Sequence, residues 1–341
     1  MKWVEPRVSL PFLACLAAAV LLTVGATEYR AHRGRGVLRA EAAARMRQAI
    51  TRLAQVRTER GIPFSSEDTG HTGIVGEEMT PLVTTLGSLG AKRMATDPAF
   101  ASLAADLFLD LGLKGGDVIA VGLSGSLPGL NIAVLSAAQA LGLLPLVISS
   151  VGASQWGATD PRFTWLDMAH AMRESGLFRF QAVAAARGGG LGGNFLLEEG
   201  WAMAGEAIRR NGLRELAGTS LHAQVRLHLE AYRQAAQGRP IRLFVNVGGS
   251  SVNVGTCEAA APRPGIVRRL PACLPDGQGL LHHFFGEGVP VIHLLNVRRL
   301  ARDHGLSVPE PGRRAETIGE EASFGGHRLP NTTPPRGFEN G

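Results

Sequence analysis

Residues 116–154 read GDVIAVGLSGSLPGLNIAVLSAAQALGLLPLVISSVGAS, and this stretch decides the fold. It opens with an apolar run, Val118 to Val121, that is short enough for a buried strand. Apolar residues at helical spacing follow from Leu130, and Gly142 stands where a helix-ending glycine belongs. A second apolar run, Leu143 to Ile148, closes the unit. Because two strands joined by a helix are almost always parallel, the stretch predicts an α/β fold with a mostly parallel sheet and flanking helices.

Both predicted strands run into turns made largely of glycine and serine. The first turn is Gly122–Ser126, and the second is Ser149–Ser154. Open α/β sheets bind their ligands at the carboxyl ends of the strands. The sequence therefore predicts where a site lies before it indicates what the site does.

The chain has 341 residues, enough for one large or two modest domains, and its 45% hydrophobic content is ordinary for a folded protein. Its formal net charge is +6, which favours anionic partners such as membrane headgroups, nucleic acid or an acidic polymer. The same charge is also consistent with basic residues that only solvate helices and flank a membrane segment. Composition alone leaves the partner open.

An uncharged segment near the N-terminus, Val8 to Thr27, is as long as the roughly 20 residues that a helix needs to cross a bilayer. It predicts an N-terminal membrane anchor within residues 1–30, hence a single-pass protein of the cell membrane. A signal peptide cleaved near Ala26 is the alternative. The arginines that follow the segment favour a cytoplasmic body, whereas a signal-anchor with a short N-terminal tail favours the opposite, so the side of the soluble domain stays open.

The rest of the chain divides into three parts. Val37 to Arg60 keeps apolar residues at a spacing of three and four, so residues 31–62 are predicted to form a helical stalk. Residues 63–304 are predicted to form the α/β domain. Residues 305–341 carry scattered proline, glycine and charge without apolar periodicity, which predicts a disordered tail.

Four turns rich in small polar residues each follow a predicted strand. If the strands are parallel, the turns line one edge of the sheet as a ring of neutral donors for a carboxylate, a phosphate or sugar hydroxyls. Such residues are also common in ordinary turns, so only the recurrence favours a site. The predicted ligand-binding residues are Thr84, Thr85, Ser124, Ser126, Ser149, Ser150, Ser154, Gly248, Gly249, Ser250, Ser251 and Asn253.

The first of the glycine and serine turns resembles a GxSxG nucleophile elbow, with serine in place of the last glycine. Ser124 and Ser126 are therefore candidate catalytic nucleophiles. No downstream Asp-then-His pair is marked out to activate them. The alternative is a helix N-terminus that binds an anion through hydroxyls and backbone N–H groups without a covalent step, and we favour this alternative.

Neither the cysteines nor the glycine-rich segment predicts a metal or a cofactor. Cys257 and Cys273, the cysteines outside the apolar N-terminal segment, can pair in an oxidising compartment but lack metal-ligand spacing. His282–His283 likewise lacks an HExxH frame, so we expect no metal. Gly188–Asn194 holds five glycines but matches neither a P-loop nor a GxGxxG fingerprint, which favours a flexible connection.

Three segments resemble the bacterial poly-γ-glutamate system protein family. They are GEEMTPLVTTLGSLGAKR at 76–93, the stretch from 116 extended to FTWLDM at 163–168, and VNVGGSSVNVGT at 245–256. The resemblance covers about residues 45–304, and it departs from the family in the 188–194 loop, which has fewer acidic residues than expected. It implies a membrane location and a role beside the poly-γ-glutamate synthase components, and it supplies no catalytic residues.

We therefore expect a membrane-anchored accessory protein of poly-γ-glutamate biosynthesis or export. It would bind the anionic polymer, a precursor or a synthase component at the carboxyl edge of the sheet, and no nucleic acid. One alternative is a serine-type amidohydrolase or transferase acting on γ-glutamyl bonds, and another is a phosphosugar-binding domain. An imidazole within hydrogen-bonding reach of a serine hydroxyl would favour the enzyme.

Overall fold

A six-stranded sheet organises the structure, a computed structural model that describes residues 10–188, 195–257 and 262–308, with side chains from residue 33 onward. The strand order is β5, β3, β2, β6, β8, β7. The strands are β2 (Val118–Ser124), β3 (Leu144–Ser150), β5 (Gln181–Ala186), β6 (Ile241–Val247), β7 (Gly265–Ile266) and β8 (Val291–Leu294). Every neighbouring pair is parallel except β7 and β8. The predicted α/β class with a mostly parallel sheet is confirmed.

The predicted strand–helix–strand unit forms the centre of this sheet. Strand β2 is joined to β3 by α4 (Pro128–Ala140), and the two strands pair in parallel over their whole length. Gly142 has a φ of +67° just after the helix, a conformation that glycine adopts without strain. All seven residues of β2 are buried, as expected of a strand covered on both faces.

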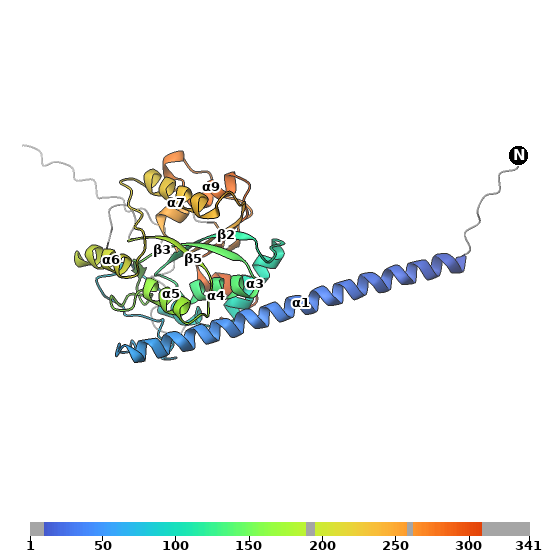
Figure 1. Cartoon of the computed structure of the whole chain (residues 1–341), viewed down its shortest axis with the longest axis horizontal. Helices are drawn as coiled ribbons and strands as arrows, with labels where there is room; N and C mark the ends of the chain where they lie inside the picture. The colour runs from blue at the N-terminus through green and yellow to red at the C-terminus, as the bar shows by residue number, and fades with distance from the viewer. Residues whose placement is uncertain (1–9, 189–194, 258–261, 309–341) are drawn as a thin grey trace, which may run out of the picture.

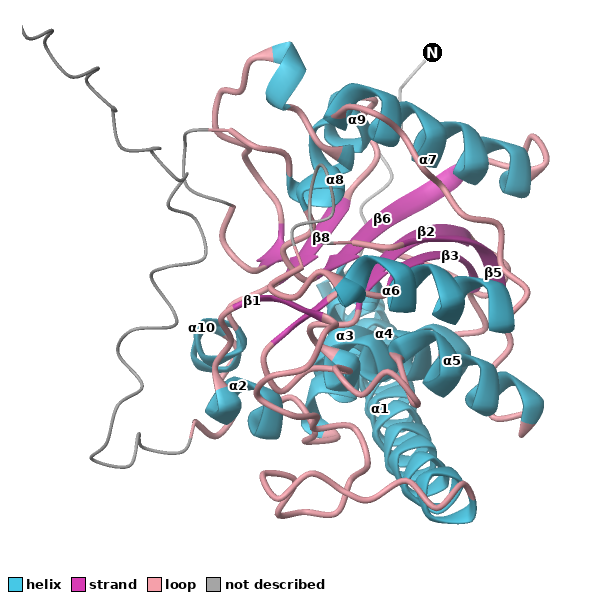
Figure 2. Ribbon diagram, turned by 90° about the vertical axis from the view of Figure 1, so that its left-hand side faces the viewer, coloured by secondary structure: helices cyan, strands magenta, loops and turns pink. Residues whose placement is uncertain are grey.

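Helices cover both faces of the sheet, as Figure 2 shows. Successive side chains of a strand point to opposite faces. Ile119 and Val121 of β2 therefore join the core beneath α1 (Leu10–Glu59), α3 (Ala99–Asp110), α4 and α5 (Trp165–Glu174). Val118 and Ala120 join the opposite core, beneath α7 (Leu221–Ala236) and α9 (Leu280–Gly286).

Shorter elements complete the described chain. A second, two-stranded parallel sheet pairs β1 (Val83–Thr85) with β4 (Ala153–Ser154). The remaining elements are α2 (Leu89–Met94), α6 (Glu199–Arg210), α8 (Ser251–Val254), the 3₁₀ helix η1 (Pro275–Gly277) and α10 (Val297–Asp303).

The predicted stalk differs from the structure, because its helix is part of the core of the body. Figure 1 shows α1 as one continuous helix that runs along the α3–α4 layer and projects beyond it. Met46, Leu53 and Val56 are buried in the core shared with α3 and α4. The 3–4 spacing correctly identified an apolar stripe, but spacing does not say what the stripe packs against. The expected boundary at residue 62 therefore does not separate two packing units.

A buried ion pair fixes the C-terminal end of α1 to the body. The guanidinium of Arg57 donates to a carboxylate oxygen of Asp160 at 2.8 Å and to the carbonyl of Pro63 at 2.9 Å. The side chains of Arg57 and Asp160 are 2% and 5% exposed, so their charges are held away from water and compensate each other. Arg162 also donates to Asp160.

No helix within the described ranges is long and apolar enough to cross a membrane. The predicted span, Val8–Thr27, falls on residues whose side chains the structure does not describe. Residues 309–341 of the predicted tail and the glycines from 189 to 194 lie outside the described residues altogether. The start of that tail is described, and it differs from the prediction, because Leu306 and Val308 pack against the core.

Candidate functional site

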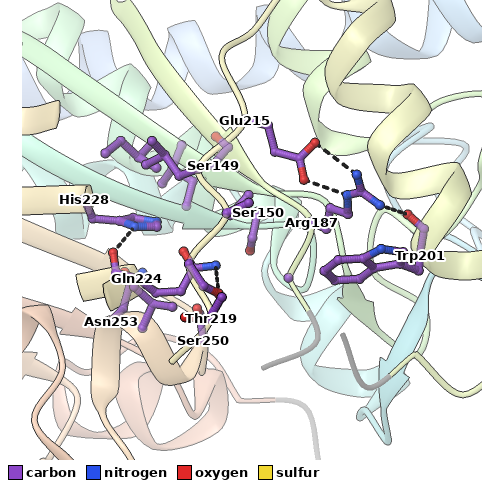
Figure 3. Close-up of a pocket in the computed structure, with 18 residues that line it drawn as sticks. Ser149, Ser150, Arg187, Trp201, Glu215, Thr219, Gln224, His228, Ser250 and Asn253 are labelled. Carbon is purple, nitrogen blue, oxygen red and sulfur yellow. Dashed lines mark hydrogen bonds and ion pairs between the residues drawn. The ribbon is translucent and has the colours of Figure 1, made fainter. Parts of the chain in front are cut away.

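A cavity of about 230 Å³ opens at the carboxyl edge of the sheet, where the sequence predicts a site. Its walls come from the ends of β2, β3 and β5, from α6, from the loop before α7 and the first turns of α7, and from α8 with the residue before it (Figure 3). Ile148, Leu216 and Val252 contribute apolar surface, while serine, histidine and amide side chains contribute polar groups. We call this cavity the edge pocket.

Two serine hydroxyls in the edge pocket are free to bind a ligand. Ser150 is the last residue of β3, and Ser250 directly precedes α8. Neither hydroxyl makes a hydrogen bond with another described residue, although both side chains line the cavity. A hydroxyl both donates and accepts, so each serine can meet either kind of ligand group.

An uncharged imidazole lines the same pocket from α7. His228 is buried, and its Nδ1 lies 2.7 Å from the carbonyl of Gln224, which can only accept, so Nδ1 carries the proton. Burial lowers the pKa of His228 to about 4, which keeps the ring neutral at physiological pH. Nε2 is therefore an acceptor with no partner among the described residues.

Gln224 adds a second unsatisfied acceptor. Its amide nitrogen lies 3.4 Å from the carbonyl of Gly218, which it donates to, while its Oε1 is buried and has no described partner. A buried acceptor without a hydrogen bond costs about 1–3 kcal/mol. A ligand that donates a hydrogen to Oε1 would remove this cost, so the pocket favours ligands with N–H or O–H groups.

The charged residues of the pocket neutralise each other. Arg187, after β5, donates to both carboxylate oxygens of Glu215, at 2.7 and 3.2 Å. Its guanidinium also donates to the carbonyl of Trp201 and lies 4.5 Å from the centre of that indole ring. Figure 3 shows the three residues together on one side of the cavity. Since the charge of Arg187 is paired with that of Glu215, the charges lining the pocket cancel.

The floor of the pocket continues into a buried amide and imidazole network. Asn253 donates to Asn246 Oδ1 at 2.7 Å, and Asn246 donates to His293 Nδ1 and to the carbonyl of Gly248, each at 2.8 Å. His293 Nδ1 must therefore accept, which places the proton on Nε2, a buried nitrogen without a described partner. Burial lowers the pKa of His293 to about 4. The hydrogen bond to Asn246 thus fixes the orientation of the Asn253 side chain.

The structure brings four of the predicted residues to this pocket: Ser149, Ser150, Ser250 and Asn253. Ser149 is already engaged, because its hydroxyl accepts from the indole N–H of Trp165 at 3.1 Å. The expected single ring of four turns is therefore divided, and its other members lie elsewhere along the carboxyl edge.

Ser124 and Ser126, the candidate nucleophiles, do not line the edge pocket. Ser124 is buried, and its hydroxyl accepts from the backbone N–H of Ser126 at 3.3 Å. The hydroxyl of Ser126 accepts from the backbone N–H of Ser154 at 3.0 Å. No described histidine forms a hydrogen bond with either serine, so the imidazole that would mark a serine enzyme is not found at these positions.

Ser154 instead contacts a lysine. Lys92 Nζ lies 2.6 Å from Ser154 Oγ and 2.5 Å from the carbonyl oxygen of Ser126. Thr84 and Thr85, on β1, lie beside this group, since Thr84 donates to the carbonyl of Ala153 and Thr85 pairs with Ser154. The turn after β2 and the turn after β3 thus meet at a lysine, away from the cavity lining.

The remaining predicted residues lie just before α8 or at its first position, and none of them lines the cavity. Gly248 covers Ser124, Gly249 is exposed, and the hydroxyl of Ser251 is buried without a described partner. These residues shape the turn that carries Ser250 and Asn253.

Cys257 and Cys273 form a disulfide, the pairing that the sequence allowed. Their sulfur atoms and a ring nitrogen of His282 lie within 4.8 Å of one another, a spacing that could hold a metal if the thiols were free. However, the N–H of Gly279 donates to His282 Nδ1, so Nε2 carries the proton and faces Cys257 Sγ at 3.4 Å. With the sulfurs joined and Nε2 protonated, this cluster does not fit a metal.

Sequence reasoning missed the contribution of α7 and of Lys92. His228 occupies an apolar stripe of α7 that includes Leu221, Val225 and Tyr232, and a histidine at such a position was a usable signal. Arg187 and Glu215 carried no comparable signal, because long-range backbone pairing brings them to the pocket: β5 pairs with β3, and Ala185 at the end of β5 pairs with Glu215.

A comparison of the chain with protein-family models, with curated proteins and with solved structures finds no match. What the site can do therefore follows from its geometry. The edge pocket is small, uncharged, and offers two free hydroxyls beside two acceptors that lack donors. It is suited to a polar ligand that carries both donor and acceptor groups.

Proposed function

We propose that this protein is a membrane-attached accessory protein of poly-γ-glutamate biosynthesis or export that binds a short part of the polymer, or a precursor, in the edge pocket. The pathway comes from the resemblance of residues 76–93, 116–168 and 245–256 to the poly-γ-glutamate system protein family. The observation that carries the binding site is the set of unpartnered polar groups on residues that line one cavity at the carboxyl edge of the sheet.

The chemistry of a γ-glutamyl unit matches these groups. Its amide N–H is a donor for His228 Nε2 or Gln224 Oε1, both of which lack one. Its carboxylate is an acceptor for the hydroxyls of Ser150 and Ser250. A cavity of about 230 Å³ has room for one or two such units rather than a long segment.

The two alternative functions have less support in the pocket. A phosphosugar site commonly pairs the phosphate with a cation, and the guanidinium of Arg187 at this pocket is already paired with Glu215. A serine-type hydrolase that uses Ser124 or Ser126 requires a base, and both hydroxyls accept from backbone N–H groups instead.

Membrane attachment through Val8–Thr27 is part of the proposal, on the strength of twenty consecutive uncharged residues. The disulfide between Cys257 and Cys273 supports a body on the oxidising side of that membrane, because disulfides persist mainly in such compartments. N-terminal sequencing of the protein from its host tests the attachment, and a mature chain that starts at Thr27 would overturn it.

The binding proposal is tested by calorimetric titration of the detergent-solubilised full chain with short γ-linked glutamate oligomers, with α-linked oligomers for comparison. We expect saturable binding of the γ-linked oligomers and weaker binding of the α-linked ones. Hydrogen bonds to a charged group contribute about 1.5–3 kcal/mol each. The Ser150→Ala/Ser250→Ala double variant should therefore bind at least about tenfold more weakly and lower polymer output in the host.

Ser66→Ala is the matched control, since Ser66 is exposed and lies outside the pocket. It should bind like the unmodified protein. Equal affinity of the double variant and the control would show that the oligomer binds elsewhere. Normal polymer output from a host that lacks the whole gene would remove the pathway from the proposal.

A further inference from the structure

A buried lysine without an acidic partner among the described residues lies where the turn after β2 meets the turn after β3. Lys92 is on α2, and the residue is 6% exposed. Its Nζ contacts the carbonyl oxygen of Ser126 and the hydroxyl of Ser154, and it forms no ion pair with any carboxylate of the described residues. An isolated ammonium in such a place is costly, and lysines in this situation tend to lose their proton.

The choice of lysine at this position is unusual for the chain. Lysine and arginine together number 35, and only Lys2, Lys92 and Lys114 are lysines. Arginine remains charged at every physiological pH, whereas a buried lysine can become a neutral amine. Position 92, which is buried without a carboxylate partner among the described residues, therefore holds a lysine, whose neutral amine can act as a base.

The hydrogen bonds around Lys92 are compatible with a neutral amine that accepts from Ser154. Lys92 Nζ donates to the carbonyl of Ser126 at 2.5 Å and to Ser154 Oγ at 2.6 Å. Once the ammonium loses a proton, the bond to the carbonyl keeps an N–H, because a carbonyl can only accept, while the contact with Ser154 can reverse, because a hydroxyl also donates. Burial lowers the pKa of Lys92 to about 7, so a large share of the amine is neutral at physiological pH. Ser154 is held in place, because its backbone N–H donates to the hydroxyl of Ser126.

We propose that Lys92 and Ser154 form a serine–lysine nucleophilic pair that transfers acyl groups from esters or amides. Lys92 Nζ takes the proton of the Ser154 hydroxyl while Oγ bonds to the acyl carbon. The bond from that carbon to the leaving oxygen or nitrogen breaks, and the Lys92 ammonium gives its proton to the leaving group. Water then attacks the acyl–serine ester with Lys92 again as base, which releases the carboxylic acid and restores Ser154.

This site is independent of the proposed ligand pocket. Neither Lys92 nor Ser154 lines the edge pocket, and the pair uses none of the pocket's hydroxyls. Ser154 is 7% exposed, its strand partner Thr85 is exposed and Ser126 is half-buried, so the pair lies close to the surface of the body.

The experiment treats the full chain in detergent with a fluorophosphonate, which forms a stable adduct on activated serines, and locates the adduct by mass spectrometry. We expect the adduct on Ser154, with a labelling rate that rises with pH and is half-maximal near pH 7, the pKa of Lys92. Lys92→Arg keeps a donor but cannot act as base, so labelling should slow at least about 100-fold. Ser154→Ala should remove the adduct.

Lys114→Met is the matched control, because Lys114 is exposed, and Ser150→Ala/Ser250→Ala reports on the edge pocket. Both should label at the unmodified rate, which separates this proposal from the binding proposal. NMR of the unmodified protein with ¹³C-labelled lysine is a test that does not depend on whether a variant folds. One of the three lysine signals should titrate near pH 7. Absence of the Ser154 adduct, labelling of Lys92→Arg at the unmodified rate, or no such titration would each overturn the pair.

Discussion

At the scale of single residues, two glycines allow polar groups to pack tightly at the carboxyl edge. A Cβ atom at Gly122 would lie 2.6 Å from the amide nitrogen of Asn253, closer than real contacts allow. A Cβ atom at Gly248 would lie 2.2 Å from Ser124 Oγ, and Gly248 also has a φ of +98°. The turn that positions Ser250 and Asn253 therefore depends on the absence of side chains at these two positions.

Gly248→Ala should lower the free energy of unfolding by roughly 2 kcal/mol or more, because alanine is strained at that φ and its methyl group would displace Ser124. Denaturant unfolding followed by circular dichroism measures the change. Gly249→Ala is the neighbouring control, since its Cβ would meet only Leu295 at 3.9 Å. Equal stability of the two variants would contradict the close contact at Gly248.

Part of the candidate site could be predicted from the sequence at the level of single residues. Ser150, Ser250 and Asn253 could be placed because each follows an apolar run that ends at the carboxyl edge. Lys92 could not be placed, because nothing in the sequence around it distinguishes a buried lysine from a solvated one. The groups that its Nζ contacts, on Ser126 and Ser154, lie 34 and 62 residues away along the chain.

At the scale of elements, α1 is the helix whose role the structure changes most. Its buried residues, which include Met46 and Leu53, contact the layer formed by α3 and α4. Arg35 extends the attachment through ion pairs with Asp106 and Asp110 on α3. A helix that shares a core with its neighbours unfolds with them, so α1 belongs to the cooperative unit of the body.

Leu53→Ala should therefore destabilise the whole body, by about 2–5 kcal/mol, since it leaves a cavity in the shared core. Thermal unfolding monitored by circular dichroism and by tryptophan fluorescence should shift equally. Arg47→Ala, on the exposed side of α1, is the control and should change stability by less than about 0.5 kcal/mol. A separate stalk would instead leave the body's transition unchanged in Leu53→Ala.

The elements themselves were predictable where one physical signal dominated. β2 and β3 are covered on both faces, so their apolar runs stand out, and α4 between them shows helical spacing and a terminal glycine. The antiparallel pairing of β7 with β8 was not predictable, because a two-residue strand at Gly265–Ile266 has no periodicity to detect.

At the scale of the whole molecule, two buried histidines link stability to pH. His228 and His293 have their pKa values lowered to about 4 by burial, against about 6.5 in an unfolded chain. Between these values the unfolded state binds more protons than the folded state. The stability associated with neutral histidines is thus complete above pH 6.5 and falls as the pH drops toward 4.

Asp160 and Asp167 act at lower pH. Burial alone would raise the pKa of each carboxyl group, but hydrogen bonds from Arg162 to Asp160 and from Arg210 and Thr164 to Asp167 outweigh it and lower both values. Their stabilisation is present above the unfolded pKa of about 3.9 and is lost as the pH falls through the lowered folded values. The two effects therefore occupy different pH ranges.

The free energy of unfolding, measured by urea denaturation from pH 7 to 4.5, should fall by up to a few kcal/mol, with the loss beginning near pH 6.5. His293→Gln should reduce the slope, because a neutral amide replaces the group that gains a proton on unfolding. His222→Gln, at an exposed position of α7, should leave the slope unchanged. A flat profile in the unmodified protein across this range would show that the buried histidines are already protonated or accessible.

The continuity of α1 also has a mechanical meaning. Its 50 residues form a rod about 75 Å long at roughly 1.5 Å per residue, with one end wedged into the core and the other reaching past the body (Figure 1). This helix has no break between its projecting end and the part that packs in the core. Because α1 is continuous, a force on its projecting end acts directly on the α3–α4 layer. A surface that binds the projecting end would therefore fix both the orientation of the edge pocket and its distance from that surface.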